Sequence, residues 1–219
     1  MSTRKEIPSR EEIFNFMDSE SRPYKFEYVR EMQPIRVSAD RRVIYVNEEF
    51  LIKVISKLVR VGLDWKQIMR KNIKHEKAHE RYLKWNLRWG VNATEYGWLA
   101  SYLTDIVIDK IHFANDEDYQ NWLHLDSRHV YKDTARELYK RFPTLCSRPH
   151  FLYNQAAYWV SIEAITLVEA VDLYPEKACY IMEMSQLFNM IKSEEDLKMA
   201  YSKALRIYLA SFGDARSQN

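Results

Sequence analysis

Residues 65–87 restrict the fold more than any other stretch, because their side chains separate at the period of an α-helix. An advance of about 100° per residue places apolar and basic side chains on different faces. The apolar face carries Trp65, Ile68, Met69, Leu83 and Leu87, and the basic face carries Lys71, Lys74, Lys77, Arg81 and Lys84. His75, Glu76 and His79 lie with the apolar set. Since the apolar face of such a helix packs on a core, the sequence predicts that these three polar side chains are buried.

These three polar residues form the pattern His-Glu-x-x-His, which has the spacing of a metal site. Histidines at positions i and i+4 lie one turn apart on the same side of a helix, so their imidazoles can bind one ion. A buried polar side chain without a partner costs about 1–3 kcal/mol, and a metal removes that cost for the imidazoles. We therefore predict zinc at His75 and His79, with Glu76 acting on a metal-bound water. The alternative is that all three are core side chains satisfied by neighbouring groups.

The composition favours a helical protein with a substantial core. The length of 219 residues fits one large domain or one domain with an extension, and 47% of the residues are hydrophobic. Only 4 glycines and 6 prolines are present, which favours long helices over a β-rich fold. The formal net charge of +2 is close to balanced, so it does not indicate nucleic acid or an anionic membrane as a partner.

The cysteines and the apolar segments bear on the compartment. Cys146 and Cys179 do not make a disulfide framework, and they suit a reducing environment. Residues 1–10 are polar and lack the apolar segment of a signal peptide. The longest apolar run, at 158–171, is interrupted by two glutamates and is too short to span a membrane. We therefore expect a cytoplasmic protein without a membrane partner.

The chain before the motif predicts a small β element between helices. Residues 37–46 place β-branched and aromatic side chains on both sides of a turn at 38–41, which indicates a β-hairpin or a pair of short strands. Capping residues mark the neighbouring helices. The predicted helices are 9–17 with Ser9 as N-cap, 48–61 with Asn47 as N-cap and Gly62 at its end, and 65–86 with Asp64 as N-cap.

A second helix, predicted at about 95–113, is apolar almost all round and is therefore expected to be buried. It nevertheless carries Asp105 and Asp109, one turn apart. Buried carboxylates need a cation or hydrogen-bond donors, so this helix is the expected source of a third metal ligand. We prefer Asp105, and Asp109 is the alternative ligand or a partner that orients a ligand histidine. Glu95 is also available, although a favourable charge at the helix start explains it.

The remainder of the chain predicts helices separated at Pro143, Pro149 and Pro175. The predicted helices are 117–124, 127–141 with Asp126 as N-cap, 150–173, 176–191 and 194–211. The fold class is therefore α+β and predominantly α-helical. We expect an N-terminal extension at 1–25, a metal-binding core at 26–114 and a helical C-terminal region at 115–219 packed on that core.

The order of these elements resembles the zincin metallopeptidases. The resemblance covers about residues 30–113, and it rests on the His-Glu-x-x-His motif, the preceding strand pattern and the run Leu103-Thr-Asp-Ile-Val-Ile-Asp109. That run looks like the acidic third-ligand helix of the gluzincin-like and aspartate-bearing branches. The Gly-x-x-His of metzincins is missing, since residues 81–86 contain neither glycine nor histidine. Membership implies a zincin-like core, an edge strand that aligns the substrate backbone, and hydrolysis of a peptide or protein.

Under this interpretation, neutral His75 and His79 hold Zn²⁺ together with Asp105, and a fourth position is left for water. The ion lowers the pKa of that water toward about 7. Glu76 takes the proton and passes it to the leaving amine, acting first as a general base and then as a general acid. The sequence does not choose among the side chains that could stabilise the oxyanion, which are Tyr96, Tyr102, His112, His124 and His129.

A ferritin-like di-iron protein is the first alternative. Glu76-x-x-His79 is also a di-iron ligand motif, and Asp126-Ser-Arg-His129 is a weaker copy of it. Two further carboxylates would come from Glu48 or Glu49 and from Asp105 or Asp109. The short separation of Asp109 from Asp126 argues against this assignment, and so does the fact that His75 and the hairpin remain unexplained.

A non-catalytic helical module that binds protein or nucleic acid is the second alternative. Its contacts would come from aromatic and basic side chains interleaved along the chain, namely Trp85, Trp89, Trp98 and Trp122 with Arg81, Lys84 and Arg88. The ordinary explanation is that the aromatics are core and the basic residues are a solvated face, which the balanced charge favours. Metal content separates the three hypotheses, because they require one zinc, two irons or none.

Overall fold

The computed structural model describes residues 6–29, 35–38, 41–88, 96–128 and 149–213. The architecture is α+β and predominantly helical, as the composition predicts. The helices are α1 (Arg10–Ser21), α2 (Glu48–Arg60), α3 (Trp65–Arg88), α4 (Gly97–Val107), α5 (Glu117–Asp126), α7 (Pro149–Ser161), α8 (Leu167–Leu173), α9 (Ala178–Met190) and α10 (Leu197–Phe212). The strands are β1 (Lys25–Tyr28), β2 (Ile35–Ser38) and β3 (Val43–Val46).

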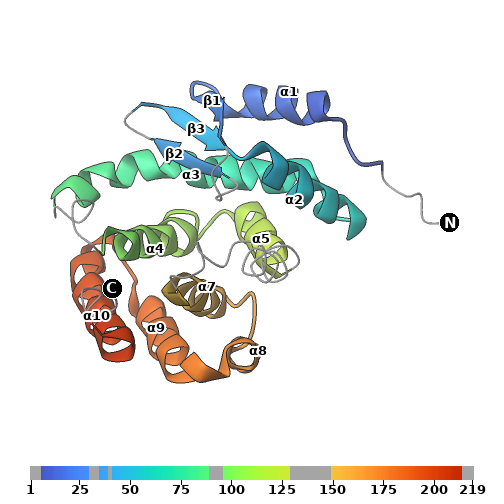
Figure 1. The fold of residues 1–219 in the computed structure, drawn as a ribbon. Helices are drawn as coiled ribbons and strands as arrows, with labels where there is room; N and C mark the ends of the chain where they lie inside the picture. The colour runs from blue at the N-terminus through green and yellow to red at the C-terminus, as the bar shows by residue number, and fades with distance from the viewer. Residues whose placement is uncertain (1–5, 30–34, 39–40, 89–95, 129–148, 214–219) are drawn as a thin grey trace.

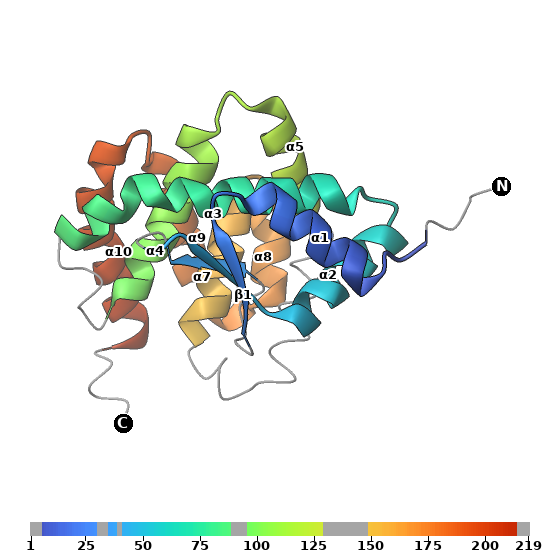
Figure 2. The same ribbon diagram turned by 90° about the horizontal axis from the view of Figure 1, so that it is seen from above.

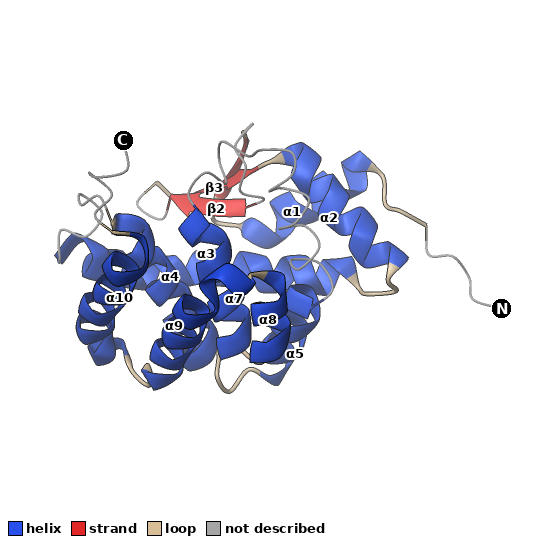
Figure 3. Ribbon diagram, turned by 60° about the horizontal axis from the view of Figure 1, so that its bottom comes forward, coloured by secondary structure: helices blue, strands red, loops and turns tan. Residues whose placement is uncertain are grey.

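The long helix α3 separates two layers of the molecule (Figure 1). On one side lie α1, the sheet and α2, and on the other side lie α4, α5 and the C-terminal helices. Figure 2 shows the same arrangement from above, with α3 running across the molecule beneath α1 and the sheet. In Figure 3 the strands are confined to one side of the helical body. Each layer has its own hydrophobic cluster, and α3 contributes to both.

The sheet has the order β1-β3-β2, and its central strand is apolar. β2 and β3 are antiparallel, with Val37 opposite Ile44, which confirms the predicted hairpin. β1 pairs with β3 in parallel and was not predicted. Residues 25–28 alternate polar and aromatic side chains, but the run is only four residues long, which is the lower limit at which alternation indicates a strand.

The first cluster joins α1, the sheet, α2 and the N-terminal half of α3. Its members include Ile13, Met17, Ile44, Val46, Leu51, Ile55, Leu58, Trp65, Ile68, Met69 and Ile73. α1 therefore packs in the same core as the sheet, although its residues were assigned to an N-terminal extension. It begins where predicted, because Ser9 accepts a hydrogen bond from the Glu12 amide at 3.1 Å, and it continues past the predicted end to Ser21.

The predicted boundaries of α2 and α3 are confirmed by their caps. Asn47 Oδ1 accepts a hydrogen bond from the Phe50 amide at 2.9 Å and satisfies one unpaired donor of the first turn of α2. Gly62 follows α2 with a φ of 83°, in the left-handed region that favours glycine. Asp64 Oδ1 accepts from the Lys66 amide at 2.9 Å at the start of α3. These contacts fix where α3 begins and hence the position of its histidines.

The buried helix predicted at 95–113 is present, but its last turn is wider than an α-helix. α4 ends at Val107, and a π-helical turn, η2 (Ile108–His112), follows it. Ile106 and Ile108 are fully buried, as the apolar composition of this segment predicts. π-helical turns inside α-helices occur often at functional sites, and this one carries Asp109.

Asp126 was predicted as the N-cap of a helix at 127–141, and this prediction is wrong. Asp126 is the last residue of α5, which begins after Asp116, and its buried side chain forms an ion pair with Lys71 on α3. A short acidic residue near a helix end resembles a cap in sequence, but here a partner in another helix decides its role. Beyond residue 128, the predicted helix lies outside the described residues.

The single helix predicted at 150–173 is also wrong, because the chain forms two helices there. α7 ends at Ser161, and Glu163 adopts a φ of 59°, which a helix cannot include. A capping box between Thr166 and Glu169 then begins α8. The apolar periodicity runs through this break, so periodicity alone gave no sign of it.

The last two helices confirm the prediction. α9 and α10 occupy the segments predicted at 176–191 and 194–211, and each follows a short 3₁₀ turn. Together with α4 and α7 they form the second hydrophobic cluster, around Trp159 and Phe188. Among the residues that the structure describes, no helix combines the length and apolar character needed to cross a membrane.

Candidate metal centre

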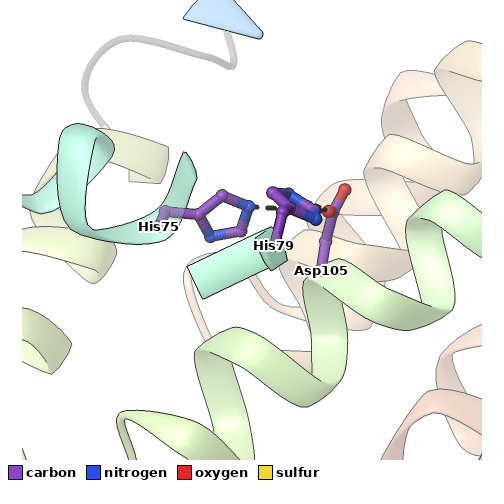
Figure 4. Close-up of side chains that lie close together, drawn as sticks. All are labelled: His75, His79 and Asp105. Carbon is purple, nitrogen blue, oxygen red and sulfur yellow. Dashed lines mark ion pairs between the residues drawn. The ribbon is translucent and has the colours of Figure 1, made fainter. Parts of the chain in front are cut away.

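The two motif histidines and the preferred aspartate meet between α3 and α4. The Nε2 atom of His75 lies 3.5 Å from Asp105 Oδ1, and the Nε2 atom of His79 lies 3.3 Å from the same oxygen. The imidazole rings are one turn apart on α3, with ring centroids separated by 5.0 Å. Figure 4 shows both rings turned toward the Asp105 carboxylate. The structure therefore brings together the three side chains that the sequence nominated as ligands.

The separations of these atoms fit a single zinc ion. One ligand atom from each of His75, His79 and Asp105 lies within 4.8 Å of the others. Zinc–ligand bonds are about 2.0–2.1 Å long, so two ligand atoms of a tetrahedral site lie about 3.3 Å apart. The two imidazole–carboxylate separations are close to that value. Two neutral imidazoles and one carboxylate are also a donor set that zinc accepts.

Asp109 holds the opposite edge of the His75 ring. The Nδ1 atom of His75 lies 2.8 Å from Asp109 Oδ1, at the distance of an N–H···O hydrogen bond. When Nδ1–H donates to the carboxylate, Nε2 keeps its lone pair and faces Asp105 and His79. Asp109 thus occupies the position expected of a residue that orients a ligand, which is the second of the two roles predicted for it.

Two tyrosines fix the Asp109 carboxylate in turn. Tyr119 from α5 donates its hydroxyl proton to Oδ1 of Asp109, and Tyr158 from α7 donates to Oδ2. Asp109 is 1% exposed, and these hydroxyls supply the donors that a buried carboxylate requires. Neither tyrosine was predicted as part of the site. They come from helices distant in sequence, and no local spacing connects them to the motif.

The cluster favours ionised carboxylates and a protonated imidazole. Burial by itself raises the pKa of Asp105, but hydrogen bonds from His75 and His79 hold it at about 2. Burial lowers the pKa of His75, yet the charge of Asp109 and the hydrogen bonds from both aspartates outweigh that effect and raise it well above its usual value. A proton and a metal ion therefore compete for the same imidazole.

Glu76 lies beside the cluster and lines the same pocket as His75 and Asp105. Burial raises the pKa of its carboxyl group, although the nearby charges of His79 and His75 oppose the rise. A raised pKa makes a carboxylate a better proton acceptor. Glu76 also has no hydrogen-bond partner among the described residues, so its oxygens are available to a ligand in the pocket.

The pocket has a volume of about 150 Å³ and lies where α3 meets α4, α5 and α7. Most of the residues that line it have polar side chains, and Leu123 and Trp159 are apolar. The polar residues are Lys71, Asn72, His75, Glu76, Tyr102, Asp105, Asp109, Ser127, Gln155 and Tyr158. The pocket thus combines an acidic cluster with one ammonium group and two amides.

The sequence placed Lys71 on the solvent face of α3, and this is wrong. Its side chain is 7% exposed, lines the pocket and forms an ion pair with Asp126, with Nζ 2.9 Å from Oδ2. The signal was present, because Lys71, His75 and His79 follow one another at intervals of four residues and therefore share a side of the helix. The apolar periodicity of α3 is followed by residues of the first hydrophobic cluster, which are Ile68, Met69 and Ile73.

Of the residues proposed for the oxyanion, Tyr102 lies in the pocket. Tyr96 packs against Tyr208, and His112 lies against Tyr82 and Phe113. His124 is half-buried on α5 and does not line the pocket, and His129 lies outside the described residues, as does the further ligand candidate Glu95.

The residues required by the di-iron alternative are directed elsewhere. Glu48 is paired with Arg10, Glu49 with Lys53, and Asp126 with Lys71. Within the described ranges, His75, His79 and Asp105 form the one group of three or more potential ligands that could hold an ion.

The aromatic residues of the binding-module alternative pack as core where they are described. Trp98 packs edge to face against Tyr102 and Tyr208, and Trp122 packs against the first cluster. Comparison of the chain with protein-family models, with curated proteins and with solved structures gives no match. The function of this chain is therefore inferred from the geometry of this site.

Proposed function

We propose that this protein is a zinc-dependent hydrolase that cleaves peptide bonds. One observation carries the proposal: the two Nε2 atoms of His75 and His79 converge on Asp105 Oδ1 at separations of 3.5 and 3.3 Å, which suit ligands of one tetrahedral ion. Glu76 lies between the two histidines in sequence and lines the same pocket.

The residues of the site divide into ligands and a base. His75, His79 and Asp105 would hold the ion, which supplies a Lewis acid and a water of lowered pKa. Glu76 would accept a proton from the attacking water and return it to the leaving amine. Its position in the pocket and the upward shift of its pKa both support this role.

The order of elements supports a zincin-like core. A strand pair, α2, the motif helix α3 and the acidic helix α4 follow one another in the order that the resemblance implies. β2 is an edge strand of the sheet and packs against α3. The pocket, however, lies on the side of α3 that faces α4, α5 and α7 (Figure 1) and is lined by no residue of the described strands, so the alignment of a substrate by an edge strand has no support from this arrangement.

Metal content and three variants test this proposal. Protein purified without added metal and then reconstituted should bind about one equivalent of zinc per chain, because three ligands make a single site. His75→Ala and His79→Ala should lose the metal. Glu76→Gln should keep the metal and lose hydrolysis of a peptide library, since a base moves a proton without holding the ion.

Elemental analysis and a peptide-cleavage assay give the outcomes. Two irons per chain, or no zinc after reconstitution, would contradict the proposed site. Hydrolysis by Glu76→Gln at the rate of the unmodified protein would contradict the mechanism while leaving the metal assignment intact.

A further inference from the structure

Lys71 is a buried cation that is neither a metal ligand nor the general base of the proposed site. It lies one turn before His75 on α3, and its whole residue is 6% exposed. It lines the pocket that also contains Glu76 and Asp105. A buried ammonium is costly unless it is paired and hydrogen-bonded, so its retention beside this cluster calls for an explanation.

The partner of Lys71 is not part of the pocket lining. Asp126 is 0% exposed and does not line the pocket, whereas Lys71 does. The Nζ–Oδ2 distance is 2.9 Å, and Asp126 is the hydrogen-bond partner of this ammonium within the described part of the chain. An ammonium has three N–H donors, so donors remain for a group in the pocket.

The other charged groups of the pocket are acidic or belong to the metal cluster. The lining contains no other lysine or arginine from the described residues. Lys71 precedes His75 by one turn of α3 and lines the same pocket as Glu76 and Asp109, so the ammonium lies beside both the base and the residue that orients His75.

We propose that Lys71 is the oxyanion-binding residue of this pocket, donating a hydrogen bond to the carbonyl oxygen of the substrate. This inference rests on the proposed hydrolase function. When the water oxygen bonds to the carbonyl carbon, the π pair of the C=O bond moves onto the carbonyl oxygen. Glu76 takes the water proton, and Lys71 keeps its own. The ammonium therefore stabilises the new negative charge without transferring a proton.

The buried pair with Asp126 makes this donor preorganised. The carboxylate holds the ammonium with its remaining donors available to the pocket, so the dipole of the pair is oriented before the substrate arrives. Donors arranged in this way stabilise charge that develops in the transition state, and loss of one typically lowers kcat by about 10²–10³. When a residue stabilises only the transition state, its removal lowers kcat and leaves KM nearly unchanged.

The decisive experiment neutralises both members of the pair in the zinc-loaded full chain. Lys71→Met alone would leave Asp126 buried and unpaired, which is strongly destabilising, so it is combined with Asp126→Asn. The double variant should bind zinc and unfold like the original protein, with kcat lower by about 100-fold or more and KM within a few-fold. Hydrolysis within threefold of the original rate would overturn the proposal.

The chain offers a matched control on the same two elements. Lys74 on α3 pairs with Asp116, the N-cap of α5, at the same distance of 2.9 Å, but this pair is exposed to solvent. Lys74→Met with Asp116→Asn makes the same change of charge, and asparagine remains a good N-cap. Its kcat should stay within twofold. An equal loss in both double variants would mean that the Lys71 effect is structural, which overturns the assignment.

Inorganic phosphate provides a readout that needs no substrate. Isothermal titration of zinc-loaded protein should show phosphate binding that is about 10-fold weaker in the Lys71/Asp126 double variant and unchanged in the control. If the protein binds phosphate in this way yet cleaves no peptide, the proposed function fails and the anion-binding role of Lys71 stands. Equal phosphate affinity in both proteins, or no binding to the original protein, overturns that role.

Discussion

The two buried faces of α3 differ in what they bury. On one face, Met69 and Ile73 are almost fully buried against α1, α2 and the sheet, and the contacts are apolar. On the other face, Lys71, His75 and His79 are turned toward α4, α5 and α7 and bury nitrogen atoms. Burial of apolar surface stabilises a fold by about 25 cal/mol per Å², whereas burial of polar groups costs free energy unless they are paired.

The difference shows which face holds the fold together and which face serves chemistry. The apolar face stabilises the protein directly. The histidines of the polar face require partners from other elements, namely Asp105 on α4 and Asp109 on η2. Asp109 in turn requires hydroxyl donors from α5 and α7, which are Tyr119 and Tyr158. A cluster assembled at such cost is typical of functional sites, where ionisable groups are buried close together.

The largest effect on stability is expected on the apolar face. Met69→Ala should lower the free energy of unfolding by about 2–5 kcal/mol, because it leaves a cavity in the first cluster. Zinc affinity of the folded variant should remain unchanged, since Met69 lies on the other side of α3 from Lys71 and does not line the pocket. Urea unfolding and zinc titration measure the two quantities. Gln67→Ala, on the same helix but half-buried, should change stability by less than about 0.5 kcal/mol.

The reverse outcome would break the comparison. If Met69→Ala weakened zinc binding as much as His79→Ala, the two faces of α3 would be coupled and not independent.

The next effect distinguishes the two aspartates on the polar face. Asp105→Ala should weaken zinc binding by more than 100-fold, because it removes a ligand. Asp109→Ala should weaken it by about 10–100-fold, the range for residues that orient a ligand. A competitive chelator titration gives both affinities. The opposite ranking would make Asp109 the ligand, and unchanged affinity in both would place the third ligand elsewhere.

That test requires folded variants. Each substitution leaves an imidazole without its carboxylate partner and can destabilise the chain by itself. Circular dichroism and urea unfolding of the metal-free variants provide the control, and affinities are compared between variants that unfold cooperatively.

The smallest effect concerns a polar link at the edge of the apolar face. Tyr24 donates a hydrogen bond to Glu80 on α3 at 2.6 Å. Tyr24→Phe should raise the equilibrium constant for unfolding by about tenfold or less, because one hydrogen bond is lost. Burial and the contact with Glu80 raise the pKa of Tyr24 from 10.0 to about 12, so its contribution is complete below pH 10.0 and is lost as the pH rises toward 12.

Glu80, the acidic member of the same pair, gives stability the opposite dependence on pH. The hydrogen bond from Tyr24 lowers the pKa of Glu80, so the carboxylate stabilises the fold above its unfolded value of 4.5 and loses that effect as the pH falls through the lowered pKa. The stability difference between the original protein and Tyr24→Phe should therefore be largest between these limits and shrink on both sides. A difference that is constant from acid to alkaline pH would exclude a titrating hydrogen bond.

Local signals in the sequence were sufficient for most of the fold. Ser9, Asn47 and Asp64 act within a few residues of the helices they cap, so their predicted roles are confirmed. The hairpin is confirmed for the same reason, since alternation and a turn define it locally. β1 was missed because its alternating segment is only four residues long, and its parallel pairing with β3 joins residues that no tight turn connects.

For the candidate site, the sequence by itself determined that His75 and His79 share one side of a helix, because i and i+4 spacing follows from helical geometry. It also nominated a pair of aspartates, since carboxylates on an apolar helix need partners. That they bind zinc stays a prediction. The choice between the two aspartates depended on how α4 packs on α3, which places Asp105 at both Nε2 atoms and Asp109 at Nδ1 of His75.

Only the tertiary structure decided the roles of Lys71 and Asp126. By sequence they were a solvated lysine and a helix cap, and each assignment was reasonable for its local surroundings. Packing of α5 on α3 buries both, and a buried charge is stable only beside an opposite one. The ion pair joins positions 55 residues apart, which no periodicity in the sequence connects. The two residues pair because packing removes both from water, and local conformation does not decide it.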